Sequence, residues 1–144
     1  FYDKEDYDNA LAVYRNALDL DPKNAKIHCN LGFLYWGKGD TDEAIREYEY
    51  AIEYDKSYSI AYNNLGVIYL DDLGRVKEAI DMFKKAVEYN PNYALAHFNL
   101  ARSIAITGEK IEAAKLYQIA QDVNKITNEI DPQDITDKIN ALFD

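Results

Sequence analysis

The residue pair with the most evident chemistry is His28-Cys29, because a thiol beside an imidazole can serve nucleophilic catalysis or bind zinc. Adjacent residues of a helix point about 100° apart, so these two side chains cannot meet at one ion or one proton. Structural zinc takes four ligands, whereas the chain has one cysteine and two histidines. We therefore expect neither a metal site nor a Cys-His nucleophile, and we expect His28 and His97 to pack between helices.

No other pattern predicts catalysis. Gly37-Lys38-Gly39 lacks the remainder of a phosphate-binding loop and is typical of a turn between helices. Acidic residues such as Glu43, Glu47 and Glu53 are scattered over helix positions that we expect to face solvent. The sequence accordingly predicts a protein that is not an enzyme and needs no cofactor.

Charge and composition exclude several classes of protein. The chain has 26 acidic and 16 basic residues, a net charge of -10, which disfavours nucleic acid and anionic membrane surfaces as partners. No apolar run is long enough to span a membrane, so we expect no insertion. Apolar residues make up 48% and aromatic residues 13%, which favours a folded domain over disorder. A single cysteine and no visible signal favour the cytoplasm, although a start at Phe1 indicates a cut chain.

A repeated pattern organises most of the chain. Asn30-Leu31-Gly32, Asn64-Leu65-Gly66 and Asn99-Leu100-Ala101 follow one another at steps of 34 and 35 residues. Each is followed by a glycine-containing turn and by a second helical pattern, Ala-x-x-x-aromatic-x-x-Ala. The four copies of that second pattern are Ala10/Tyr14/Ala17, Ala44/Tyr48/Ala51, Ala79/Phe83/Ala86 and Ala113/Tyr117/Ala120. Spacings of three and four place each set on one helix face, where small residues permit close packing and aromatic rings fill the gap.

These motifs resemble the tetratricopeptide repeat, a 34-residue helix–turn–helix unit. The resemblance implies an all-α fold, a right-handed superhelical solenoid of antiparallel helix pairs. It divides the chain into a partial repeat (1–24, with its second helix at Asp6–Leu20), repeats at 25–58, 59–93 and 94–127, and a C-terminal capping helix (128–144). The middle repeat has one extra residue in its inter-helix turn, near Asp71 to Gly74.

The C-terminal helix is predicted from Asp131-Pro132, since proline fits the first turn of a helix. Its apolar stripe is Ile135, Ile139, Leu142 and Phe143. We expect this stripe to cover the last repeat. In the alternative, it docks onto another copy of the chain or begins a further domain.

The resemblance also implies a concave groove lined by the first helix of each repeat, where a peptide would bind. Carried over residue by residue, the candidate binding residues are Lys26, Asn30, Phe33, Trp36, Asn63, Asn64, Val67, Leu95, Phe98, Asn99 and Arg102. An asparagine amide both donates and accepts, so the equivalent Asn30, Asn64 and Asn99 could pair with an extended peptide backbone. The alternative is that asparagine is simply common at this position of the family.

Heat-shock-chaperone adaptors of the family hold a C-terminal carboxylate with a clamp of Lys, Asn, Asn, Lys and Arg. Here Cys29 and Phe33 stand where clamp Lys and Asn would be, and Asn99 stands in place of the arginine. Arg102, one turn further on, is the nearest substitute. We therefore do not expect a carboxylate clamp.

The sequence thus predicts a non-catalytic scaffold that binds a protein or peptide segment in its groove. Two alternatives stay open. The chain could self-assemble into a homo-oligomer, because Ala10, Tyr14 and Ala17 belong to a helix whose partner helix is incomplete. It could also be the substrate-recognition arm of an enzyme whose catalytic domain lies outside these residues.

Overall fold

The computed structural model describes residues 3–144, and every regular element in that range is helical. The predicted all-α class is therefore confirmed. The elements are α1 (Lys4–Leu20), α2 (Ala25–Lys38), α3 (Thr41–Tyr54), α4 (Ser59–Val67), η1 (Ile68–Asp72), α5 (Val76–Tyr89), α6 (Ala94–Ile106), α7 (Lys110–Thr127) and α8 (Pro132–Ala141). The predicted end of a preceding repeat helix at Phe1 and Tyr2 lies outside the described residues. No helix in residues 3–144 is long and apolar enough to cross a membrane.

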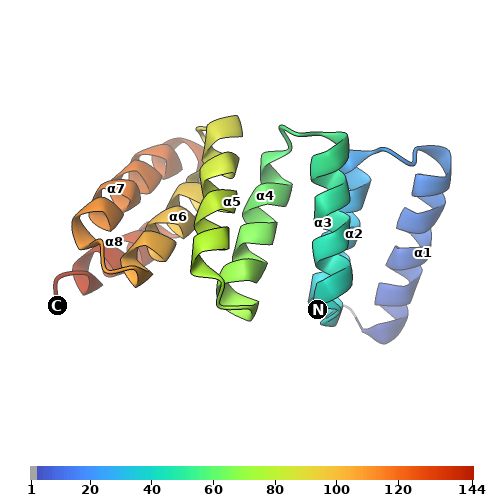
Figure 1. Ribbon diagram of the computed structural model, residues 1–144, viewed down its shortest axis with the longest axis horizontal. Helices are drawn as coiled ribbons and strands as arrows, with labels where there is room; N and C mark the ends of the chain where they lie inside the picture. Colours follow the sequence, from blue (N-terminus) through green and yellow to red (C-terminus); the bar gives the residue numbers. More distant parts are fainter. Residues whose placement is uncertain (1–2) are drawn as a thin grey trace. The chain divides into compact units, whose positions relative to one another are not determined.

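The helices form two compact units, Phe1–Asn64 and Leu65–Asp144, with the boundary inside α4. In the first unit, α1 packs against α2 and α2 packs against α3. In the second unit, α5, α6, α7 and α8 pack in chain order, each against the next. Short turns join the paired helices within each unit, and α2–α3 and α6–α7 run in opposite directions, as predicted (Figure 1).

Side-chain caps decide where two helices of the first unit begin. α1 starts at Lys4, earlier than the predicted start at Asp6, because Asp3 Oδ1 accepts a hydrogen bond from the Asp6 N–H at 2.9 Å. Asn24 Oδ1 likewise accepts from the Ile27 N–H, at 3.1 Å, and starts α2. In both cases a carboxylate or amide oxygen satisfies a backbone donor that the first turn of a helix leaves open.

A small residue beneath an aromatic ring forms the centre of each helix pair. Tyr48 of α3 is fully buried, and a Cβ placed on Gly32 of α2 would lie 2.8 Å from its ring. In the second unit, Gly66 stands in the same relation to the buried Phe83, at 2.7 Å. No real Cβ is found at such distances, so glycine is required at both positions while the rings stay where they are.

The first copy of the Ala–aromatic–Ala pattern is packed differently from the other three. Ala10, Tyr14 and Ala17 of α1 are only partly buried, whereas the corresponding residues of α3, α5 and α7 are at most 1% exposed. Among residues 3–144, α2 is the neighbour that α1 contacts most. This face of α1 is therefore less covered than the corresponding faces of α3, α5 and α7.

The extra residue of the middle repeat is absorbed by a π-helical turn. η1 continues α4 over Ile68–Asp72, and the Leu73 N–H donates to the carbonyl of Ile68, five residues back, at 3.2 Å. A single inserted residue widens a helix in this way without breaking its hydrogen bonding. The extra residue was predicted in the inter-helix turn, near Asp71 to Gly74, and that placement is corrected, since the widened turn belongs to the end of the helix.

α8 packs against α7 in the second unit. Ile135 is fully buried and Leu142 is 8% exposed within the core of the second unit, whereas Phe143 is 62% exposed. The prediction that Phe143 belongs to the buried stripe is therefore wrong. The helix has ended before Phe143, so its side chain no longer follows the helical spacing.

Asn124 fixes the turn that leads into α8. Its amide Nδ2 donates to the Ile130 carbonyl at 2.6 Å, and its Oδ1 accepts from the Ile130 N–H at 2.9 Å. The side chain is 4% exposed, so both bonds are sheltered from water. Asn124 lies outside the repeated motifs of the sequence, so no local pattern marks it.

We expect Gly32→Ala to lower the free energy of unfolding by about 1 to 2 kcal/mol, because overpacking against Tyr48 outweighs the higher helix propensity of alanine. Gly37→Ala, in the same helix, is the matched control. Its Cβ would meet only the end of the Tyr7 side chain, 2.7 Å from the hydroxyl, which can move away. Urea denaturation followed by circular dichroism measures both variants. Equal midpoints for the two would contradict the close-approach constraint.

We expect Asn124→Asp to destabilise the α7–α8 connection by about 2 kcal/mol, because an isosteric carboxylate loses the donor and faces a buried carbonyl. Asn140→Asp, on the exposed side of α8, makes the same charge change and should have little effect. Hydrogen exchange of the α8 amides is the direct readout. Unchanged protection of α8 in Asn124→Asp would show that the side chain does not hold this turn.

Candidate functional site

The most open of the predicted binding residues lie on α2. Lys26 is exposed, Asn30 and Trp36 are partly exposed, and Phe33 is 60% exposed. The other side of the helix carries buried residues, among them Leu31 and Leu34. Positions 26, 30 and 33 follow a helical spacing, so the three side chains share one face of the first unit. We call Lys26, Asn30, Phe33 and Trp36 the α2 face.

The two asparagines of α4 differ in accessibility. Asn63 is 1% exposed, whereas Asn64 is partly exposed. The Asn63 amide lies 3.5 Å from Asn64 Oδ1. A ligand could therefore reach Asn64 in the structure as it stands, but not Asn63.

The predicted binding residues of the second unit are engaged in packing or bonding. Phe98 meets Tyr117 edge-on with ring centroids 5.4 Å apart, and Val67 also packs against the core of this unit. Asn99 is 5% exposed. Arg102 donates to Asp71 through Nη2 at 2.9 Å. This part of the predicted site presents less free surface than the α2 face.

The main-chain N–H of Leu95 donates a hydrogen bond to Glu129 Oε2 at 3.0 Å. The side chain of Leu95 is partly exposed. The three equivalent asparagines are thus not equivalent in the structure, because Asn30 and Asn64 are partly open and Asn99 is buried. Their role in binding stays a prediction.

His28 is bonded through both ring nitrogens and has no free group for chemistry. Nε2 lies 2.9 Å from the carbonyl of Pro22, which can only accept, so this nitrogen carries a proton. Nδ1 lies 2.7 Å from Glu47 Oε2, and the rings of Tyr50 and Tyr54 pack alongside. The predicted packing role of His28 agrees with this arrangement. The prediction that Glu47 faces solvent is wrong, because its side chain is 15% exposed and bonded to the imidazole.

The same bond recurs at the corresponding position of the other repeats. His97 Nε2 lies 2.8 Å from the carbonyl of Pro91, and the Tyr62 hydroxyl donates to the carbonyl of Lys56 at 3.0 Å. Each partner is six residues earlier, at the turn before the helix. All three residues have a large side chain with a polar tip, and the prediction that His28 and His97 pack between helices did not include this hydrogen bond.

Cys29 is not placed to act as a nucleophile. Its side chain is 4% exposed, and burial raises the pKa of the thiol to about 12. The reactive species would be the thiolate, which is scarce at neutral pH when the pKa is that high. No group of three or more histidine, cysteine or acidic side chains in residues 3–144 could hold a metal ion.

Comparisons with known proteins identify the repeat. Two family models, described as TPR repeat and tetratricopeptide repeat, match residues 1–39 with 72–103 and residues 29–86, respectively, so together they cover residues 1–103. No curated protein sequence matches the chain significantly.

Two solved structures show the same fold. The TPR2B domain of yeast Sti1, in a structure described as its complex with pHsp70, superimposes with a TM-score of 0.76 and 22% identity. That match covers 82% of this chain and 94% of the domain. MamA superimposes with a TM-score of 0.71 and 23% identity, over 88% of this chain and 69% of MamA. With the repeat motifs and the small-residue packing of its helix pairs, the chain belongs to the tetratricopeptide-repeat family, whose fold is a scaffold for protein–protein interaction.

Proposed function

We propose that this chain binds a segment of another polypeptide on the α2 face, with Phe33 as the apolar anchor. The observation that carries the proposal is the 60% exposure of Phe33 on a helix whose other apolar residues are largely buried. Burying an exposed aromatic side chain is worth about 1.5–3 kcal/mol, so leaving one open is consistent with use in binding.

The polar neighbours of Phe33 suit a polypeptide ligand. The Asn30 amide, one turn before Phe33, can donate to and accept from a peptide backbone whatever the side chains of that peptide are. Asn64, also partly exposed in the first unit, offers the same groups. Lys26 adds a cation that favours a carboxylate on the partner. The described complex of the Sti1 domain with pHsp70 supports a polypeptide partner by analogy with the fold alone.

Self-association through α1 is the second candidate. Besides its partly open Ala–aromatic–Ala face, α1 exposes Val13 to 65% and Leu20 to 90%. Apolar side chains exposed together on one helix favour contact with another protein surface, including a second copy. This candidate uses a different helix from the α2 face, so the two can be separated by mutation.

We expect Phe33→Ser to weaken partner binding by about tenfold to a hundredfold, as for an aromatic anchor at the centre of an interface. The double variant Asn30→Ala/Asn64→Ala should weaken it less, because each amide contributes one neutral hydrogen bond or two. The measurement is affinity capture from a lysate of the source organism, followed by titration of the captured protein against the purified chain. Circular dichroism confirms that each variant is folded.

Val13→Ser is the matched control, since it removes an equally exposed apolar side chain from α1. It should leave capture unchanged but should reduce any concentration-dependent mass seen by light scattering. Loss of the partner in Val13→Ser with retention in Phe33→Ser would reject the α2 face and favour α1.

A further inference from the structure

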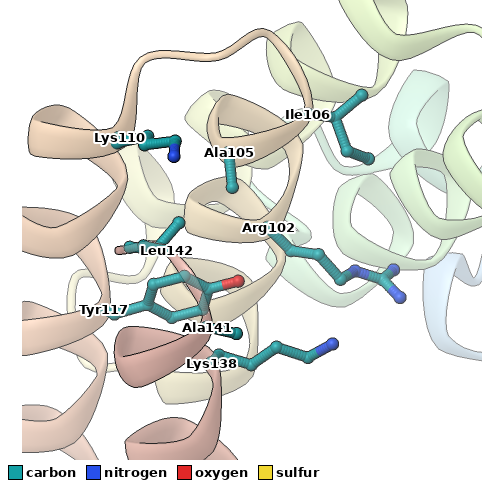
Figure 2. A pocket seen from close by; sticks show the side chains of 8 residues that line it. All are labelled: Arg102, Ala105, Ile106, Lys110, Tyr117, Lys138, Ala141 and Leu142. Carbon is teal, nitrogen blue, oxygen red and sulfur yellow. The ribbon is translucent and has the colours of Figure 1, made fainter. Parts of the chain in front are cut away.

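A hollow of about 330 Å³ opens on the surface of the second unit, where α6, α7 and α8 come together. Its charged lining residues come from three helices: Arg102 from α6, Lys110 from α7 and Lys138 from α8. Figure 2 shows the side chains of Arg102 and Lys138 extending in the same direction, with the Tyr117 hydroxyl directed toward the space beside them. The hollow lies within one compact unit, so its geometry does not depend on the first unit.

The charge of this hollow is opposite to that of the chain. Its lining has three cations and no carboxylate, although acidic residues outnumber basic ones by 26 to 16 in the sequence. Arg102 is paired with Asp71 at 2.9 Å, so Lys110 and Lys138 carry the positive charge that is left over, and an anion placed beside these two lysines is favoured. The arrangement therefore favours a negatively charged ligand.

Arg102 has hydrogen-bonding capacity left for such a ligand. Its Nη2 donates to Asp71 at 2.9 Å, but its Nε–H is buried and has no hydrogen-bond partner among residues 3–144. Buried donors in folded proteins are rarely left without an acceptor. The Arg102 side chain is 29% exposed, so a carboxylate in the hollow can form a charge-assisted bond with the accessible part of its guanidinium group.

The rest of the lining suits a carboxylate attached to a hydrocarbon stem. Tyr117 is 1% exposed, and burial raises the pKa of its hydroxyl, so its ring forms an uncharged floor beside the cations. Ala105, Ala141 and Leu142 supply an apolar wall. A glutamate side chain fits both kinds of surface, because its methylene groups would contact the apolar wall and its carboxylate would lie beside the cations.

We propose that this hollow binds the side chain of a glutamate within a segment of the partner protein. The proposal rests on the proposed function, because it takes the partner to be a polypeptide. A C-terminal carboxylate lies next to the backbone N–H of its own residue, which would enter the hollow with it and would need an acceptor. The only side-chain acceptor in the lining is the Tyr117 hydroxyl. A phosphate would leave the apolar wall uncovered. The site also differs from a carboxylate clamp, because Lys110 and Lys138 come from α7 and α8.

The test is a titration of the full ¹⁵N-labelled chain with a short peptide that carries a central glutamate between alanine and leucine and is capped at both ends. Amide shifts should move at Ala105, Ala141 and Leu142, and the same peptide with glutamine should move them much less. Lys138→Gln should raise the Kd about threefold to fivefold, and Lys110→Gln/Lys138→Gln should raise it about tenfold. Lys115→Gln, an exposed lysine of α7 outside the hollow, should leave the Kd unchanged.

Equal shifts with the glutamate and glutamine peptides, or an equal loss in Lys115→Gln, would overturn the proposal. So would tighter binding at these amides by inorganic phosphate, or by a glutamine peptide with a free C-terminal carboxylate. Phe33→Ser separates this inference from the proposed function, because it should leave the glutamate-peptide shifts intact. If Phe33→Ser still captures the partner while Lys110→Gln/Lys138→Gln does not, the α2 face fails and the glutamate site stands.

Discussion

The close approach of a small residue to a large aromatic ring is the contact on which each helix pair depends. Tyr48 and Phe83 fill space that exists only because Gly32 and Gly66 have no Cβ, and in the last repeat Ala101 and Tyr117 belong to one buried cluster. Such rings bury a large apolar area and tolerate little displacement. The pairing therefore fixes how each first helix is rotated, and with it which of its residues face outward.

The residues available for binding are those that the packing of the helix pairs leaves exposed. Once Leu31 and Leu34 are turned inward, the remaining side of α2 carries Lys26, Asn30 and Phe33, none of which the fold requires to be inside. Repeats can thus keep one packing pattern while their outward residues vary, which is why the fold by itself does not name a partner.

Buried polar residues add specificity to the packing. His28, Tyr62 and His97 each bond to a carbonyl six residues earlier, and Asn124 bonds to both main-chain groups of Ile130. These bonds tie the start of a helix, or the turn before it, to the helix body. A buried polar group must find a partner or lose stability, so such residues also select one arrangement of the turns.

The sequence by itself determined the helices, their pairing and the residues at the pair centres, because Ala44/Tyr48/Ala51 and its equivalents follow a helical spacing that depends only on local geometry. It also located the insertion near Asp71 and the helix that starts at Pro132.

Only the tertiary structure decided which members of a repeated set are accessible. Asn30 and Asn64 stay partly open, whereas Asn99 is buried, and Glu47 turned inward to meet His28. The hollow between Arg102, Lys110 and Lys138 likewise had no local signal. Accessibility and charge convergence depend on residues brought together from different helices, and a one-dimensional pattern does not contain those distances.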